Sequence, residues 1–461
     1  MAESPQARLP NRKLFGYAFM EMPLAMAATP MALFIAPFYS RDLGLSLAMV
    51  GTIMMLARIS DVITDPLIGQ LSDRTRTRWG RRKPWILAGA PITLLSVWML
   101  FVPIEPVTDL YFGFWLVLLW LGWTFIGIPF YAWGAEISPD YHERTRIASV
   151  RMSFGLIGTL TGMLLPLLAG WFLGYGHEIR ESLHIIAMTA SVFFVLALMA
   201  MWMVPEGEPV ETRRISLAEG IRVMWRNGPF KRLMAGFTIA AIGPAVGGPL
   251  YILFVIYVLD GNLPPNVILL VFYTSNLLGV ALWNRVAHHV GKRNAWLMGM
   301  TVVIIAQPCY LLLGTGDEYE LLAVLALLGI GIGSFNAIPA AMKADVVDLD
   351  RLRSGEDRTA LFFSVWSLAN KFVLAVSAGA VLWLLGYFFG FDAKGENGPE
   401  QIQALRLVFC LLPMPFYFVA FAVVWKYPIT EARHQRLIAL LERRTERRNA
   451  RQARDPSAAA V

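Results

Sequence analysis

The sequence predicts an all-α integral membrane protein whose twelve transmembrane helices form two pseudo-symmetric six-helix halves. The first observation is the composition: of 461 residues, 56% are hydrophobic and 16% are charged, and the mean hydropathy is +0.54. Soluble domains carry about 25% charged residues, so this chain has too little polar surface for water. The second observation is that the apolar residues lie in long blocks, and the third is a pair of loop patterns that occurs twice.

Apolar blocks long enough to cross a bilayer recur along the whole chain. Residues 111–135 and 323–342 contain no Asp, Glu, Lys or Arg. A helix of about 20 such residues, with a rise of about 1.5 Å per residue, crosses the hydrocarbon core. Spans are expected near 14–38, 45–71, 84–104, 110–137, 150–175, 181–204, 230–258, 266–287, 294–314, 319–343, 358–388 and 402–426.

The basic residues lie mostly in alternate loops. An even number of spans puts both termini on one side, and that side carries the basic clusters at 8–13, 74–83, 213–232, 292–293 and 426–454. The other side has little beyond Arg41, Arg180, Lys394 and Arg406. Such an excess is typical of the cytoplasmic face. The net charge of +7 therefore indicates topology, with both termini cytoplasmic in a bacterial inner membrane, and not nucleic-acid binding.

A polar, basic segment separates the first six spans from the last six. We expect an N-terminal six-helix half at 1–204, a cytoplasmic middle loop at 205–229, a C-terminal half at 230–426 and a basic cytoplasmic tail at 427–461.

Two loop patterns occur once in each half. "GRR" at 80–82 follows span two, and "GKR" at 291–293 follows span eight. Residues 129–148 and 339–360 follow spans four and ten, and each contains a proline, an acidic patch and a closing Arg-Thr. Parallel repeats of six spans, with a binding site at their interface, are the architecture of the major facilitator fold.

The loop after span two resembles a known motif more specifically. "GQLSDRTRTRWGRRKP" at 69–84 is similar to the Gly-x-Leu-Ala-Asp-Arg-x-Gly-Arg-Arg loop of the major facilitator superfamily, lengthened in the middle. Its motif residues are Asp73, Arg74, Gly80, Arg81 and Arg82. We expect the glycine to permit the turn, Asp73 to cap or to bridge to the neighbouring half, and the arginines to fix the cytoplasmic side. Glu136, at the end of span four, is expected to pair with these basic loops.

The flanking residues narrow the resemblance. "ARISDVITDP" at 57–66, "RWGRRKPW" at 78–85 and "IPFYAWGAEISPDYHERTR" at 128–146 resemble the glycoside–pentoside–hexuronide cation symporters, the melibiose-carrier family. This resemblance covers nearly the whole chain and implies cation-coupled symport of a glycoside or sugar-like solute by alternating access. Because the larger group includes lysolipid symporters, a lysolipid or other amphipathic anion is the alternative solute.

Three ionisable residues share one face of span two. Arg58, Asp61 and Asp65 lie at positions i, i+3 and i+7. Two carboxylates one turn apart in a low dielectric do not both ionise comfortably without a cation, so the pair suits Na⁺ or H⁺ as the coupling ion. The resemblance implies that Asp61 and Asp65 bind this cation and that Thr124 assists. The alternative is a structural ion pair with Arg58.

Lys371 lies in span eleven with no other charge near it in sequence. The resemblance matches it to a lysine that faces the cation site across the two halves. There it neutralises the carboxylates when the cation is absent, and so couples ion binding to closure. A lysine that extends to the membrane interface is the alternative.

The expected sugar contacts are only partly present. In melibiose-type carriers, acids on spans one and four are implied to hold the sugar, and they fall here on Ala25 and Gly127. Carboxylates bind vicinal hydroxyls in a bidentate way, so we expect α-galactosides to bind poorly. Arg151 matches a sugar-contacting arginine, with a cytoplasmic anchor as its alternative.

A different polar pocket is conceivable from side chains on several spans. The remaining candidates are Glu21, Tyr131, Asn336 and Asn370, and each is alternatively a packing contact between helices.

Other function classes lack their motifs. There is no HExxH, no GxSxG and no His/Asp cluster at catalytic spacing, so a membrane-embedded enzyme is disfavoured. Cys309 and Cys410 provide neither a disulfide framework nor a metal knuckle. We therefore expect no cofactor or metal beyond the coupling ion. The expected partners are a small-molecule solute, the cation and membrane lipids.

Overall fold

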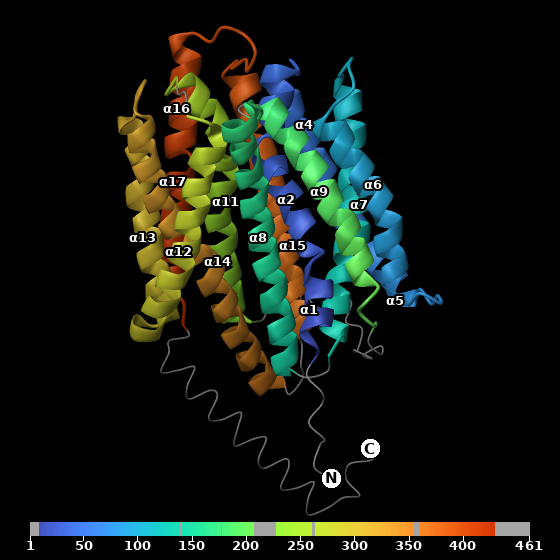
Figure 1. Ribbon diagram of the computed structural model, residues 1–461. Helices are drawn as coiled ribbons and strands as arrows, with labels where there is room; N and C mark the ends of the chain where they lie inside the picture. Colours follow the sequence, from blue (N-terminus) through green and yellow to red (C-terminus); the bar gives the residue numbers. More distant parts are fainter. Residues whose placement is uncertain are drawn as a thin grey trace, which may run out of the picture.

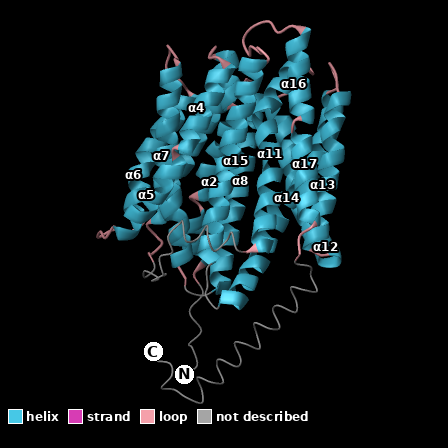
Figure 2. Ribbon diagram, turned by 180° about the vertical axis from the view of Figure 1, so that it is seen from behind, coloured by secondary structure: helices cyan, strands magenta, loops and turns pink. Residues whose placement is uncertain are grey.

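The computed structural model describes residues 9–138, 141–176, 178–206, 227–260, 263–354 and 359–428. The described residues form helices with no strand, and the helices run roughly parallel in one bundle (Figures 1 and 2). Within these described ranges, eleven helices are long and apolar enough to cross a membrane, and a bent pair raises the number to twelve if it is one span. The prediction of twelve spans is therefore confirmed. Most of the middle loop and nearly all of the basic tail lie outside the described residues.

The first span, expected near 14–38, is broken into several helical pieces. It consists of α1 (Asn11–Ala18), α2 (Glu21–Leu33), α3 (Ile35–Pro37) and the π-helix η1 (Phe38–Asp42). The chain bends by 52° after Leu33. Pro37 contributes to this break because proline has no N–H to donate to the carbonyl of Leu33 and its ring crowds that carbonyl.

The other helices lie close to their expected positions. Those of the N-terminal half are α4 (Leu47–Ile59), α5 (Asp61–Arg74), α6 (Lys83–Phe101), α7 (Asp109–Glu136), α8 (Tyr141–Leu173) and α9 (Ile179–Met201). Those of the C-terminal half are α11 (Gly228–Tyr257), α12 (Pro265–Val290), α13 (Lys292–Cys309), η2 (Tyr310–Leu312), α14 (Glu318–Ser354), α15 (Thr359–Trp383), η3 (Leu384–Phe388), α16 (Pro399–Leu411) and α17 (Pro413–Trp425). Helices α8 and α14 extend past the expected apolar spans into polar residues, and they do so at the same end of the bundle.

The two halves repeat the same packing. Helix α2 packs on α8 as α11 packs on α15, and α6 packs on α7 as α13 packs on α14. Between the halves, α4 packs on α15 at one seam and α8 packs on α12 at the other. These equivalent pairs are the pseudo-symmetry that the repeated loops predict.

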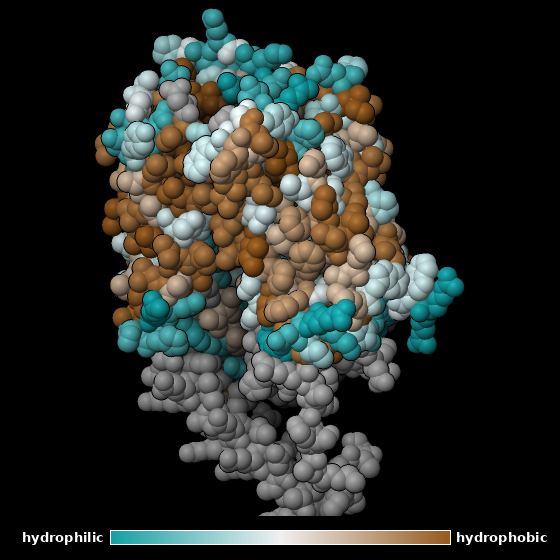
Figure 3. All heavy atoms as spheres, in the orientation of Figure 1, coloured by the Kyte–Doolittle hydropathy of each residue, from teal (hydrophilic) through white to brown (hydrophobic). Residues whose placement is uncertain are grey.

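The halves meet closely toward the end opposite the termini. A Cβ added at Gly51 of α4 would lie 2.7 Å from the carbonyl oxygen of Gly379 on α15, so only glycine permits this approach. At the other seam, Asn266 Nδ2 donates to Ser182 Oγ at 3.0 Å. On the face shown in Figure 3, hydrophobic residues form a broad belt across the bundle, with hydrophilic ones gathered above and below it. This distribution matches a protein that spans a bilayer.

Candidate functional site

Asp65 is held by side chains from two other helices, one in each half. Thr124 Oγ1, on α7, donates to Asp65 Oδ1 at 3.0 Å. Lys371 Nζ, on α15, forms a close ion pair with Asp65 Oδ2. Lys371 therefore crosses the interface to contact the carboxylate, and does not extend to the membrane surface.

Asp61 lies one turn before Asp65, at the start of α5. Its residue is 4% exposed, and Arg58 Nη1 contacts its Oδ2 at 3.4 Å. Its Oδ1 is buried without a hydrogen-bond partner among the described residues. The Arg58 guanidinium also stacks over the ring of Trp120, 3.2 Å from its centroid. The carboxylate thus keeps one oxygen free to accept a proton or an ion.

The formal charges of this cluster balance. Asp61 and Asp65 carry two negative charges, and Arg58 and Lys371 carry two positive ones. An added cation would leave an excess positive charge unless a basic group withdrew. Among the described residues, no group of three or more His, Cys, Asp and Glu side chains is placed to hold a metal ion.

A second polar cluster joins three of the expected substrate residues. Arg151 Nη1, on α8, contacts Glu21 Oε2 of α2 at 3.0 Å. The Tyr131 hydroxyl, on α7, donates to Glu21 Oε1 at 3.3 Å. The Arg151 guanidinium lies 4.5 Å from the centroid of the Tyr131 ring. Arg151 therefore contacts this cluster, whereas Arg146, earlier on α8, pairs with Glu143 at 2.6 Å.

The two asparagines lie elsewhere on the helices. Asn336 Nδ2, on α14, donates to Asn276 Oδ1 of α12 at 3.1 Å, which is a contact between helices of one half. Asn370 is half-buried and directly precedes Lys371 on α15. The contact of Asn336 does not involve Glu21.

The motif loop after α5 forms an ion-pair network within its own half. Arg82 pairs with Glu136 at 2.6 Å and with Asp73 at 2.7 Å, and Arg81 pairs with Glu136 at 2.8 Å. Burial disfavours the charge of Arg82, but its hydrogen bonds to Glu136 and Asp73 outweigh this and raise its pKa. Asp73 was expected to cap or to bridge to the neighbouring half, and its ion pair lies instead inside this loop. Arg74 is exposed.

Glu206 is a member of this network that sequence reasoning missed. Its carboxylate accepts the backbone N–H groups of Arg82 and Lys83 at 2.9 and 2.8 Å, so it caps the start of α6. It also occupies the space where a side chain at Gly80 would lie, and Gly80 has a φ of +106°. The only available signal was an acidic residue directly after span six.

The C-terminal half has an ion pair at the equivalent position. Lys292 Nζ, in the repeated "GKR", contacts Asp345 Oδ1 at 2.6 Å. The loop pattern that occurs in both halves therefore corresponds to equivalent ion pairs in the structure.

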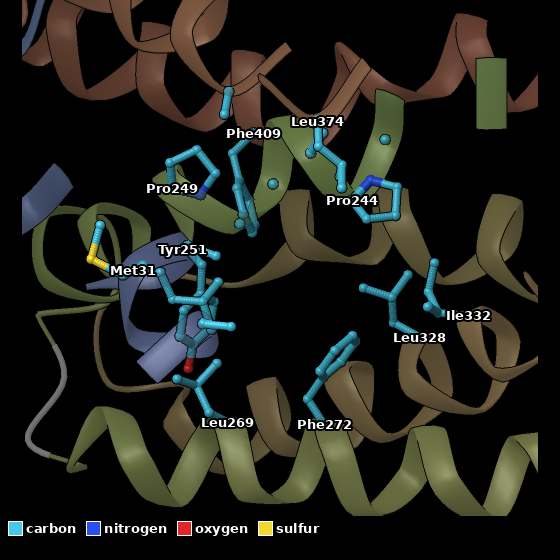
Figure 4. A pocket seen from close by; sticks show the side chains of 18 of the residues that line it. Met31, Pro244, Pro249, Tyr251, Leu269, Phe272, Leu328, Ile332, Leu374 and Phe409 are labelled. Atoms are coloured by element: carbon cyan, nitrogen blue, oxygen red, sulfur yellow. The ribbon is translucent and has the colours of Figure 1, made fainter. Parts of the chain in front are cut away.

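A cavity of about 310 Å³ lies between the halves, beside Arg58 and Trp120. Figure 4 shows side chains of α2, α11, α12, α14, α15 and α16 around an open space, including Met31, Phe272 and Leu374. Among the described residues that line it, Arg58 alone is charged. This volume lies at the lower end of the range for small-molecule sites, and the lining is strongly apolar.

The comparisons with known proteins agree with this geometry. The model of the family "MFS/sugar transport protein" matches residues 16–431. A putative glycoside/cation symporter of Escherichia coli is 27% identical, over 87% of this chain and 88% of that protein. The E. coli glucuronide carrier protein homolog is 25% identical, over 94% and 96%. The human sodium-dependent lysophosphatidylcholine symporter 1 is 24% identical, over 83% and 77%.

Solved structures show the same fold. The nucleoside transporter NupG, as a D323A mutant, superposes with a TM-score of 0.65 at 13% identity, covering 89% of this chain and 98% of that chain. A bacterial homolog of the human lysosomal transporter Spinster gives 0.63 at 14% identity, covering 92% and 100%. The chain therefore belongs to the MFS/sugar transport protein family, and its resemblance to the glycoside–pentoside–hexuronide cation symporters is confirmed.

Proposed function

We propose that this chain couples the downhill movement of Na⁺ or H⁺ to the symport of a glycoside or other sugar-like solute by alternating access, and that it catalyses no reaction. The observation that carries this proposal is the ion pair between Asp65 of the N-terminal half and Lys371 of the C-terminal half. A charge pair across the moving interface links ion occupancy to the relative position of the halves.

The coupling follows from the charge balance. Without the ion, Lys371 neutralises Asp65 and joins the halves. When a cation or proton binds at Asp61 and Asp65, Lys371 loses its partner and its hold across the interface weakens. Thr124 offers a hydroxyl oxygen that suits a hard ion such as Na⁺. When no cation is bound, the positive charge of Arg58 reduces the repulsion between the carboxylates of Asp61 and Asp65.

The polar cluster favours a solute with hydroxyl groups. Glu21 and Arg151 neutralise one another, and together with Tyr131 they offer donors and acceptors without net charge. The curated relatives include a putative glycoside/cation symporter and a glucuronide carrier homolog. Asn336 and Asn370 remain candidate contacts from the other half.

The second candidate is symport of a lysolipid or other amphipathic anion. It rests on the apolar cavity beside Arg58 and on relatives named as lysophosphatidylcholine symporters.

The location also belongs to the proposal. The relatives from E. coli support a bacterial inner membrane. The alternation of basic loops supports a cytoplasmic side that holds both termini, the middle loop 205–229 and the tail 427–461.

Uptake into reconstituted vesicles tests the proposal. We expect a glucoside or glucuronide to accumulate only when a sodium or proton gradient is imposed, and melibiose to compete at least about a hundredfold more weakly, because two charge-assisted contacts are missing at Ala25 and Gly127. Accumulation that is independent of every cation gradient would contradict coupling. Tight melibiose binding would show that the sugar is held by residues other than those proposed.

A further inference from the structure

The cavity beside Arg58 is poorly matched to a sugar ring. Met31, Phe272 and Leu374 present apolar surfaces to it. A hydroxyl group that enters such a space without a partner costs free energy. An apolar part of the solute would instead gain from leaving water there.

One face of α2 connects the polar cluster to this cavity. Glu21, Ala25, Ala28 and Ala32 are spaced by four, three and four residues, so they lie on the same face. None of the four is buried, whereas Met22, Leu24, Met26 and Ala27 of the same helix are. Ala28 and Ala32 line the cavity, and the helical rise places Ala28 about 10 Å along the axis from Glu21. The three alanines form a shallow apolar wall between the two sites.

A face of α7 follows the same course. Tyr131, Gly127, Trp120 and Leu116 are spaced by four, seven and four residues, and the last two line the cavity. Gly127 is buried, and a Cβ added there would touch the Tyr131 ring at 3.7 Å, an ordinary van der Waals contact. Thr124, which donates to Asp65, lies between Gly127 and Trp120 on this face. The face of α7 therefore passes the cation cluster on its way to the cavity, and the apolar wall of the path is that of α2.

We propose that the solute is an amphipathic glycoside. Its glycone binds at Glu21, Tyr131 and Arg151, and its alkyl or aryl aglycone lies along Ala25 and Ala28 and ends in the cavity. This inference rests on the proposed function and adds the chemical class of the solute. This placement gives a physical reason for the absence of carboxylates at Ala25 and Gly127. A carboxylate at either position would put a negative charge beside the apolar aglycone.

The test is competition binding to the full-length protein in native-lipid vesicles with methyl, butyl and hexyl β-glucosides, kept below their micellar concentrations. Each methylene that is fully buried tightens binding about fourfold. We expect the hexyl glucoside to bind at least about tenfold more tightly than the methyl glucoside. Ala378→Phe fills the cavity and should reduce this ratio to about one, because Ala378 lines the space. Ala380→Phe, an exposed position two residues further along α15, is the matched control and should keep the ratio.

Leu374→Asn provides a second variant that changes the lining without adding volume, should Ala378→Phe fail to insert. Equal binding of all three glucosides, or a chain-length gain that persists in both variants, would overturn the inference while leaving cation-coupled glycoside symport intact. A lysophospholipid that binds where no glucoside does would overturn the proposed function as well.

Discussion

The two ion-pair networks at the terminus-bearing ends of the halves differ in kind from the charge cluster around Asp65. Arg82 with Glu136, and Lys292 with Asp345, each join residues of a single half. Lys371 and Asp65 belong to different halves. A contact within one half moves with that half as a rigid body, whereas a contact across the interface must change when the halves separate. The first kind stabilises the fold, and the second kind can report whether an ion is bound.

The largest effect should follow from removing a carboxylate of the cross-interface cluster. We expect Asp61→Asn and Asp65→Asn each to reduce gradient-driven accumulation on the order of a hundredfold, because an amide neither binds a cation by charge nor exchanges a proton. Insertion and folding should persist, since the substitution removes a buried charge. Solute accumulation in vesicles with an imposed sodium or proton gradient measures this.

Asp73→Asn is the matched control for these variants. Asp73 is a carboxylate of the same helix, α5, but its side chain is 43% exposed and it pairs within its own half. The Asp73→Asn variant should accumulate solute to within about threefold of the unmodified protein, because an exposed ion pair contributes only about 1 kcal/mol or less to stability. If Asp73→Asn abolished accumulation as completely as Asp65→Asn, the distinction between the two kinds of cluster would not hold.

A smaller effect is expected for Lys371. Replacing it by alanine leaves Asp65 without its partner across the interface, so cation dependence should weaken by about tenfold while solute exchange continues in part. Lys371→Arg retains the positive charge and should preserve more of the coupling. Transport rate as a function of cation concentration, measured beside solute counterflow, separates coupling from translocation. If Lys371→Ala depended on cation concentration as the unmodified protein does, Lys371 would have only a structural role.

The smallest effect on coupling, and the largest on stability, should arise in the loop networks. The Arg82 side chain is 4% exposed and contacts both Glu136 and Asp73, so Arg82→Ala removes one of the two cations of Glu136 and leaves Arg81 as the other. A loss of about 1–3 kcal/mol in stability is expected. The Lys292 side chain is 27% exposed but that of its partner Asp345 is only 8% exposed, so Lys292→Ala should cost about 1–3 kcal/mol.

The stabilities of Arg82→Ala and Lys292→Ala are compared by their thermal unfolding midpoints in the same detergent. Cation affinity is measured separately on the folded fraction of each variant. The cation affinity of that fraction should be unchanged in both. A shift in cation affinity as large as that in Lys371→Ala would mean that the loop networks take part in coupling directly.

The sequence by itself determined the number of spans, the two-half repeat and the family. Apolar blocks longer than about 20 residues have one stable outcome in a bilayer, because every backbone polar group must be satisfied inside the helix. The shared face of Arg58, Asp61 and Asp65 also followed from helical periodicity. Spacing alone left open whether Arg58 or a cation partners the carboxylates.

Only the tertiary structure decided which residues meet across the bundle. It brings Glu21, Tyr131 and Arg151 together from three helices. It also shows that Asn336 donates a hydrogen bond to Asn276 and that Asp73 pairs with Arg82 of the same loop. The cap that Glu206 forms on α6 and the cavity between the halves were likewise not readable from spacing. Periodicity fixes the face of a helix on which a side chain lies, but the neighbour of that face depends on how helices distant in sequence pack.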